Sequence, residues 1–281
     1  MRHKSRRLHI SDNLFFNTIA KHQSTKRSLL CIGLDPDIER MPAEIRGEQH
    51  PIFTFNKAII EATQDLACCY KPQIAHYAAA GAESQLEMTI DFIKTLEIPV
   101  LLDAKRGDVG GTAAMYAKES FVRYGADAIT INPYLGLDSM TPYLDHADKG
   151  VFILCRTSNP GAGELQNLML DNGSRLFEHV AQEASTTWNY NGNVGLVVGA
   201  TRPAELQRIR EIVGQTTLLL PGVGSQGADV SQMMSAGAGG GMLVSSSRSI
   251  IFASEGKDFA SAAREVALTT RDEINQYRKA A

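Results

Sequence analysis

Eight short apolar runs, separated by longer amphipathic segments, constrain the fold of this chain more than any other feature of its sequence. The runs are rich in leucine and β-branched residues and occupy residues 28–35, 70–77, 99–105, 128–134, 150–157, 194–201, 216–224 and 240–247. Alternating strand-like and helix-like segments are typical of βα units around a parallel sheet. The runs are nearly continuously apolar, which indicates strands buried on both faces, as in a barrel surrounded by helices. The sequence therefore predicts an α/β protein with a (β/α)8 TIM barrel.

The barrel is expected to be a single domain over residues 28–281, because no linker or shift in composition interrupts the βα pattern. Residues 1–27 form an N-terminal extension. In it, Asp12 precedes apolar residues at helical spacing, namely Leu14, Phe15 and Ile19. This spacing predicts a helix with an acidic cap and one apolar face, packed on the barrel.

Charge and composition indicate the class of partner. With 28 basic and 31 acidic residues, the formal net charge is −3, which gives no field that favours nucleic acid or a membrane surface. A small-molecule ligand is expected instead. The basic start of the chain lacks the apolar core of a signal peptide, and no run approaches the roughly 18 apolar residues of a membrane span. We therefore expect a cytoplasmic protein.

The cysteines are expected to be reduced and mostly buried. The chain has four of them, without the paired spacing or neighbouring histidines of a metal site: Cys31, Cys68, Cys69 and Cys155. His76 falls in the second predicted strand and, without a paired ligand, is expected to be structural. No metal ligand set is predicted.

Polar residues at the carboxyl ends of the predicted strands are the candidate site, because TIM barrels carry their active sites at that end. The candidates are Asp35, Lys71, Asp103, Lys105, Asn132, Ser158, the turn Gly222-Val223-Gly224, Ser247 and Arg248. Asp103 and Lys105 lie two residues apart, so both should point into the mouth of the barrel. An internal ion pair without a function is the alternative. Lys71 at the neighbouring strand favours a functional array, since burying so many charges costs stability.

The seventh and eighth predicted strands indicate a phosphate site. Loops after these strands frequently bind phosphate in TIM barrels, and here they read PGVGSQGAD and SSSRSI. Gly222 and Gly224 would let backbone amides approach a phosphate, while Arg248 would donate two hydrogen bonds. Glycines alone would also fit a simple turn, so Arg248 strengthens the interpretation.

The segment LLDAKRGDVGGTA resembles the Asp-x-Lys-x-x-Asp signature of orotidine 5′-monophosphate decarboxylases. The likeness extends to CIGLDPD, YKPQ, TINPYLG, TSNPGAGELQ and LPGVGSQGAD, which resemble the longer, type 2 branch of that family. These motifs span nearly the whole chain from about residue 28. The combination is highly specific, although Asp-x-Lys-x-x-Asp alone is not.

The resemblance implies a homodimeric barrel that converts orotidine 5′-monophosphate to uridine 5′-monophosphate (UMP) and carbon dioxide. This is the last step of de novo pyrimidine nucleotide synthesis, and no metal or organic cofactor is implied. By position in the motif, Lys105 would donate the proton to C6 and Asp103 would lie beside the departing carboxylate. Asp108 would be supplied by the partner subunit, and Lys71 would complete the alternating charges.

The same resemblance implies the substrate contacts. Thr112 would reach across the dimer, Asp35 would bind a ribose hydroxyl, and Ser158 would bind the amide edge of the pyrimidine. The phosphate would be held by Gln226 together with Ser247 and Arg248. Taken singly, Thr112 also fits a helix N-cap, while Ser158 and Asp35 also fit turns before a proline.

Two other functions are compatible with the motifs. A metal-assisted sugar-phosphate lyase of the same barrel superfamily can share Asp-x-Lys-x-x-Asp, and a magnesium requirement would identify it. A non-catalytic nucleotide-binding barrel would keep the charged array for recognition alone. Turnover of orotidine 5′-monophosphate by the purified protein distinguishes the decarboxylase from both.

Overall fold

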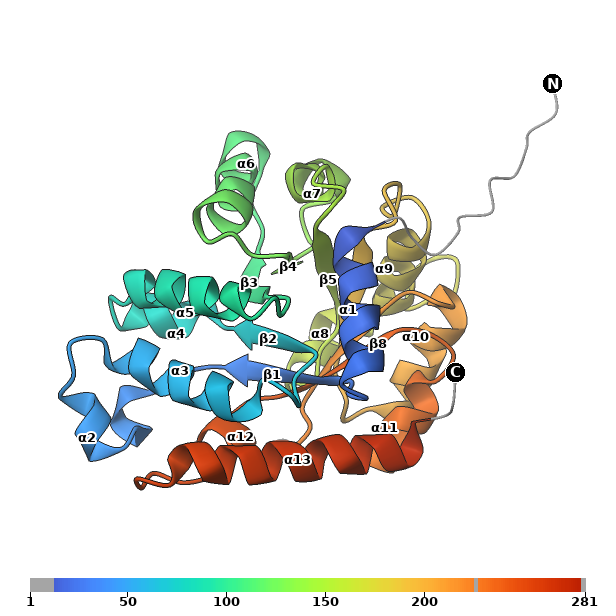
Figure 1. Cartoon of the computed structure of the whole chain (residues 1–281). Coiled ribbons are helices and arrows are strands. Elements are labelled where there is room, and N and C mark those ends of the chain that lie inside the picture. The colour runs from blue at the N-terminus through green and yellow to red at the C-terminus, as the bar shows by residue number, and fades with distance from the viewer. Residues whose placement is uncertain (1–12, 225–226, 279–281) are drawn as a thin grey trace.

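Eight parallel strands form a closed barrel in the computed structural model, which describes residues 13–224 and 227–278 (Figure 1). The strands are β1 (Leu30–Leu34), β2 (Cys69–Pro72), β3 (Leu101–Arg106), β4 (Ala128–Ile131), β5 (Gly150–Arg156), β6 (Val194–Val198), β7 (Leu218–Pro221) and β8 (Met242–Ser246). They pair in the order β2-β1-β8-β7-β6-β5-β4-β3. Parallel bridges from Tyr70 to Val100 and from Gln73 to Asp103 join β2 to β3. The predicted (β/α)8 TIM barrel is therefore confirmed.

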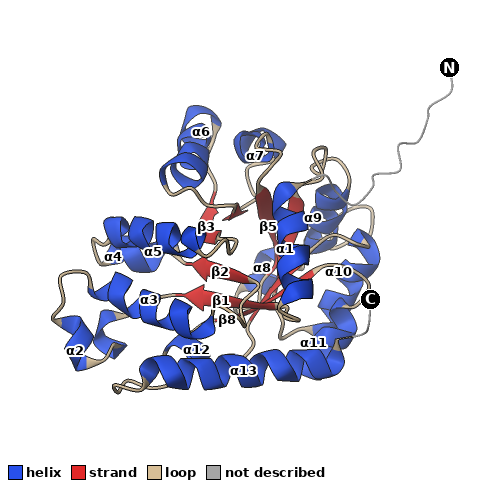
Figure 2. Ribbon diagram, viewed as in Figure 1, coloured by secondary structure: helices blue, strands red, loops and turns tan. Residues whose placement is uncertain are grey.

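Helices surround the strands on the outside (Figure 2). They are α1 (Leu14–Thr25), α2 (Ala43–Arg46), α3 (Pro51–Thr63), α4 (Ile74–Ala79), α5 (Glu83–Thr95), α6 (Gly110–Lys118), α7 (Leu137–Leu144), α8 (Ala162–Gln166), α9 (Leu176–Ser185), α10 (Pro203–Val213), α11 (Val230–Gly237), α12 (Arg248–Ile251) and α13 (Phe259–Tyr277). A 3-10 turn covers Ile38–Arg40, and a π-helical turn, Glu119–Arg123, continues α6. None of the helices in these described ranges is both long enough and apolar enough to cross a membrane.

Two apolar cores explain why the strands are nearly continuously apolar. In β5, Val151 and Ile153 pack in the core between strands and helices, whereas Phe152 packs in a second core inside the barrel. Successive side chains of a strand point to opposite faces, so both faces must be apolar when both are buried. Alternation between apolar and polar residues is absent for this reason.

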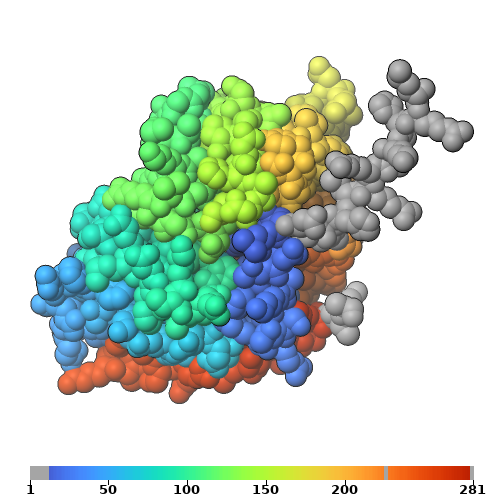
Figure 3. Space-filling model, turned by 45° about the horizontal axis from the view of Figure 1, so that its top comes forward, coloured from blue at the N-terminus to red at the C-terminus, as the bar shows by residue number. Residues whose placement is uncertain are grey.

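Helix α1 closes the amino end of the barrel. Phe15 and Ile19 join the interior core, and Phe15 packs edge-on against Phe152 with ring centroids 6.0 Å apart. Gly150 starts β5 directly beneath this helix, where any Cβ would collide with the ring of Phe15. Figure 3 shows α1, in dark blue, seated between segments from the two halves of the chain. Helix α1 thus contributes to the interior core of the barrel. The division of the chain at residue 27 stays a prediction from the sequence.

The cap of α1 is Asn13, whereas the sequence favoured Asp12, which lies outside the described residues. The Asn13 carboxamide oxygen accepts the Phe16 N–H at 3.0 Å, and its nitrogen donates to the carbonyl of Ala147 at 2.7 Å. One side chain thus accepts a free N–H group at the start of the helix and also connects the helix to the loop before β5. Asparagine can do both because it carries a donor as well as an acceptor.

The second strand is shorter than predicted, and the placement of His76 in a strand is wrong. The strand β2 ends at Pro72, and residues 74–79 form α4, which includes His76. Gln73 accounts for the difference, because its side-chain oxygen accepts the Ala75 N–H at 3.1 Å and caps the helix. A ring nitrogen of His76, Nδ1, lies 2.9 Å from the Pro36 carbonyl oxygen.

Candidate active site

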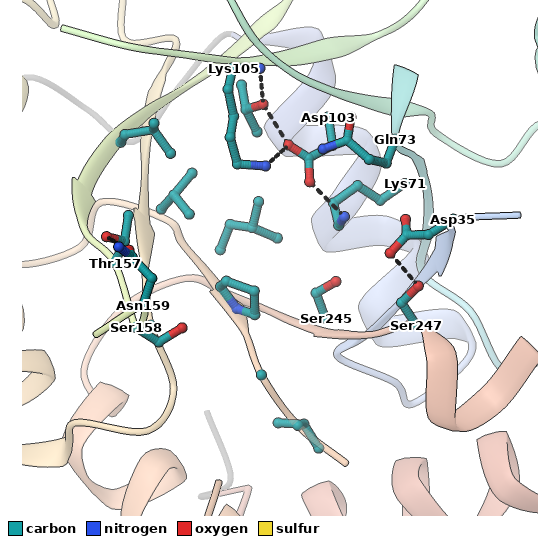
Figure 4. A pocket seen from close by; sticks show the side chains of 18 of the residues that line it. Asp35, Lys71, Gln73, Asp103, Lys105, Thr157, Ser158, Asn159, Ser245 and Ser247 are labelled. Atoms are coloured by element: carbon teal, nitrogen blue, oxygen red, sulfur yellow. Dashed lines mark hydrogen bonds and ion pairs between the residues drawn. The ribbon is translucent and has the colours of Figure 1, made fainter. Parts of the chain in front are cut away.

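A cavity of about 610 Å³ opens at the carboxyl ends of the strands, where the sequence placed the site (Figure 4). Nine of the predicted residues line it: Asp35, Lys71, Asp103, Lys105, Ser158, Gly222, Val223, Ser247 and Arg248. Asn132, Asp108, Thr112 and Gly224 are not among its lining residues. Most of the predicted strand ends thus converge on one site, whereas residues 108, 112, 132 and 224 do not line it.

A carboxylate held between two ammonium groups is the electrostatic centre of the cavity. The two oxygens of Asp103 each receive one lysine: Oδ2 lies 2.8 Å from Lys71 Nζ, and Oδ1 lies 2.6 Å from Lys105 Nζ. Asp103 and Lys71 are buried, whereas the Lys105 side chain is 44% exposed toward the cavity. Lys105 is therefore the ammonium group of this pair that an incoming ligand meets.

The paired charges more than compensate for burial at both Asp103 and Lys71. Burial alone would raise the pKa of the Asp103 carboxyl, but the charges of Lys71 and Lys105 hold that pKa well below its usual range. Burial alone would likewise lower the pKa of the Lys71 ammonium, and the charge of Asp103 raises it above the ordinary value. Both groups are consequently charged at neutral pH.

Lys105 reaches Asp103 through a bulge at the end of β3 and not through the regular pleat predicted from the sequence. Its φ is 47°, in the left-handed region, and the pairing of β3 with β4 shifts register between Leu102 and Arg106. The Thr130 hydroxyl, on β4, accepts the N–H groups of Ala104 and Lys105, each at 3.0 Å. The same hydroxyl donates to Asp103 Oδ1 at 2.9 Å. Thr130 therefore fixes both the backbone of the lysine and the carboxylate that it contacts.

Asp35 lies on the wall opposite the β5 loop, at the end of β1 (Figure 4). One of its oxygens, Oδ2, accepts the Ser247 hydroxyl at 2.6 Å. The other oxygen, Oδ1, is buried and has no hydrogen-bond partner among the described residues. Gly33 permits this approach, because a Cβ there would lie 2.6 Å from Ser247 Cβ. The free oxygen is a ready acceptor for a ligand hydroxyl.

The glycine turn after β7 has the backbone geometry of a close-approach loop. Gly222 and Gly224 have φ values of 116° and 87°, which residues with a Cβ rarely adopt. A Cβ at Gly224 would also collide with the side chain of Ser249. Arg248, the first residue of α12, is exposed and lines the same side of the cavity. Gln226, the remaining predicted phosphate residue, lies outside the described residues.

Asp108 and Thr112 lie beyond the cavity of their own barrel. Asp108 Oδ1 accepts the N–H of Val109 at 2.8 Å, and Thr112 is exposed on α6. Thr112 is not the N-cap of that helix, because the cap is Val109. Exposed apolar side chains gather on this part of the chain, namely Val109, Met115, Val122, Tyr134 and Leu135. This region therefore has the composition of a surface that another protein covers.

Several polar residues that line the cavity were not identified from the sequence, among them Gln73, Thr130 and Gln166. Thr130 lies in the motif TINPYLG near the end of β4, so its position at a strand end could have identified it. Gln166 lies on α8, nine residues beyond Thr157, and acts through a bond between the two. Nothing in the local pattern indicates that contact.

The histidines and cysteines do not add a metal site in the part of the chain that is described. No group of three or more His, Cys, Asp or Glu side chains within residues 13–224 and 227–278 could hold a metal ion. The four cysteines are unpaired and buried, and burial raises the pKa of the Cys68 and Cys155 thiols. They are inert core residues.

Comparison with known proteins gives one consistent result. Residues 28–265 match the orotidine 5′-phosphate decarboxylase / HUMPS family. A curated orotidine 5′-phosphate decarboxylase of Ralstonia pickettii is 53% identical over 269 residues, which cover 94% of this chain and 99% of that protein. An orotidine 5′-phosphate decarboxylase of Dechloromonas aromatica is 55% identical, covering 89% and 94% of the two chains. The solved OMP decarboxylase of Leishmania donovani is 39% identical with a TM-score of 0.80, covering 95% and 99%.

Proposed function

Because the chain belongs to the orotidine 5′-phosphate decarboxylase / HUMPS family, we propose that it converts orotidine 5′-monophosphate to UMP and carbon dioxide. The protein is then a carboxy-lyase of the last step of de novo pyrimidine nucleotide synthesis. The observation that carries this proposal is the Lys71–Asp103–Lys105 array, buried on one side and open to the cavity at Lys105.

The charged array suits a reaction that forms a carbanion. Loss of carbon dioxide from C6 of the pyrimidine places a lone pair in an sp² orbital that the ring cannot delocalise as an enolate does. An ammonium group at C6 stabilises that charge and then delivers the proton. Lys105, held by Asp103 at 2.6 Å, is fixed before the reaction, so little reorganisation is needed in the transition state.

Asp103 has two roles in this proposal. It orients both lysines, and it lies where the carboxylate of the substrate would depart. Its low pKa keeps it negatively charged, so it repels that carboxylate until carbon dioxide leaves. We rank this repulsion second to stabilisation of the carbanion by Lys105.

The remaining walls match the other parts of a nucleotide. The free Oδ1 of Asp35 would accept a ribose hydroxyl, and Ser158 would contact the amide edge of the pyrimidine. The phosphate would bind to backbone amides at Gly222 and Gly224, to Ser247 and Arg248, and to Gln226. Binding energy from this remote group would help to position the base for reaction.

A homodimer would complete the site. Asp108 and Thr112 lie outside their own cavity, on a segment that also exposes Val109 and Met115. If this surface packs against a second copy, Asp108 and Thr112 would reach the partner's cavity. The exposed apolar residues support the interface, because a monomer rarely leaves such a cluster in water.

The test is turnover of orotidine 5′-monophosphate by the purified protein, followed by the loss of orotate ultraviolet absorbance. We propose a cytoplasmic enzyme that needs no metal or organic cofactor, so activity should persist after dialysis against a chelator. Activity that disappears with chelator and returns with magnesium would instead identify the metal-assisted lyase chemistry. Absence of turnover combined with tight nucleotide binding would identify a non-catalytic barrel.

A further inference from the structure

Arg156, the last residue of β5, is 1% exposed and has the largest fully buried side chain in the described ranges. Its Nη1 donates to the Thr157 carbonyl at 2.9 Å and to Gln166 Oε1 at 3.0 Å. Its Nη2 donates to Glu205 Oε1, on α10, at 3.2 Å. Arg156 does not line the cavity. It therefore ties the end of β5 to α8 and α10 from behind the cavity wall.

Gln166 extends the hydrogen-bond network of Arg156 to Thr157, which lines the cavity. Its Oε1 also accepts the Thr157 N–H at 2.9 Å, and its Nε2 donates to the Thr157 hydroxyl at 2.9 Å. That hydroxyl donates to Asn159 Oδ1 at 2.6 Å. Side chains thus hold the backbone of Thr157, and a side-chain hydrogen bond joins Thr157 to Asn159 across Ser158. The hydrogen bond from the guanidinium to Gln166 Oε1 is charge-assisted and is therefore stronger than a hydrogen bond between neutral groups.

The neighbouring strand leaves little space for Ser158 to move. The Gly199 N–H donates to the Arg156 carbonyl at 2.8 Å, at the end of β6. A Cβ at Gly199 would lie 2.9 Å from Ser158 Cβ and 3.0 Å from Ser158 N. Ser158 therefore packs directly on the backbone of β6. Its position depends on how the network holds the loop against that strand.

The loop forms one wall of the cavity, across from Asp35 and Ser247 (Figure 4). In the proposed function the Asp35 wall meets the sugar and the Ser158 wall meets the base. A displaced loop would therefore weaken recognition of the base and leave the sugar contacts intact. This separation makes the role of the network measurable.

We propose that Arg156 and Gln166 are positioning residues that set the affinity for the pyrimidine by fixing Ser158, without contributing to the affinity for ribose 5-phosphate. The inference rests on the proposed function, since it assigns the base to the Ser158 wall. Glu205 pairs with the buried guanidinium, which offsets the cost of burying its charge.

The experiment compares UMP with ribose 5-phosphate, which lacks the base, by calorimetric titration of the intact protein. Gln166→Ala removes three of the bonds at the loop. Arg156→Lys retains the charge opposite Glu205 but cannot bridge Thr157 and Gln166 as a guanidinium does. In each variant we expect the Kd for UMP to rise about tenfold, equivalent to about 1.4 kcal/mol, and the Kd for ribose 5-phosphate to change less than about twofold. The double variant should be no weaker than Gln166→Ala, because both residues act through one loop.

Gln23→Ala is the matched control, because it removes a carboxamide that donates to the Met242 carbonyl at 2.7 Å at the opposite end of the barrel. It should leave both affinities unchanged. Unchanged UMP affinity in Gln166→Ala, or equal weakening of UMP and ribose 5-phosphate, overturns the inference. Turnover of orotidine 5′-monophosphate by the unmodified protein is measured first. Its absence would refute the proposed function, whereas normal turnover with unchanged variant affinities would refute the positioning role alone.

Discussion

Replacing Thr130 by valine should damage both the stability of the barrel and the geometry of its charged centre. Valine has nearly the shape of threonine, so the change removes the hydroxyl without opening a cavity. That hydroxyl is buried, with its residue 1% exposed, and makes three hydrogen bonds. It accepts from two backbone amides and donates to Asp103. All three bonds lie at the bulge that carries Lys105.

The expected loss of stability follows from these bonds. A buried N–H left without an acceptor costs about 1–3 kcal/mol, and a hydrogen bond to a charged group contributes about 1.5–3 kcal/mol. The lower limits for two N–H groups and one carboxylate bond add to about 3.5 kcal/mol. Lys105 would also lose the bonds that hold its left-handed backbone, and a displacement near 1 Å costs roughly 100-fold in rate.

Urea unfolding followed by circular dichroism measures the first effect, and orotate absorbance measures the second. Thr130→Ser is the matched control, because it retains the hydroxyl and loses only a methyl group. The serine variant should stay within about 1.5 kcal/mol of the unmodified protein and keep most of its activity. If the valine and serine variants unfold at the same urea concentration and turn over equally, Thr130 does not organise the site.

Three further changes test other parts of the structure. Mixing Lys105→Ala with Asp108→Ala subunits should restore activity in heterodimers, since one site then regains both residues; no recovery would count against a shared site. Because the pKa of folded Asp103 lies below its unfolded value, its stabilisation is present above pH about 4 and is lost as pH falls through the folded pKa. Urea titrations across that range should show a smaller loss for Lys71→Met than for the unmodified protein, and equal losses would refute the pairing. Phe15→Ala should lower the unfolding free energy by about 3–5 kcal/mol while the folded variant keeps its kcat, and a folded but inactive variant would contradict a purely structural role for α1.

The barrel could be predicted because burial on both faces leaves a strong signal in each strand. Phe152 faces the interior while Val151 and Ile153 face the helices, so the run has no polar interruption. The end of the second strand could not be predicted in the same way. Apolar residues recur beyond Pro72 at Ile74, Ala75 and Tyr77, and the Gln73 side chain starts a helix there.

The candidate site could be predicted as a set of residues but not as a geometry. Strand ends place Asp103 and Lys105 at the mouth of the barrel whatever the local backbone does. The bulge at Lys105 depends on the Thr130 hydroxyl of the next strand, 25 residues later in the chain. The hydrogen bond from Arg156 to Glu205 joins residues that are 49 positions apart in the sequence. These contacts form only when the barrel is folded, so the local spacing of residues in the sequence does not predict them.

The central claim is that the ammonium group of Lys105 performs the chemistry in a site organised by Asp103. The most direct measurement is decarboxylation of orotidine 5′-monophosphate by purified Lys105→Ala, followed by orotate absorbance, alongside calorimetric binding of UMP. The account predicts that turnover is abolished while nucleotide binding remains measurable. Full activity in this variant would contradict it.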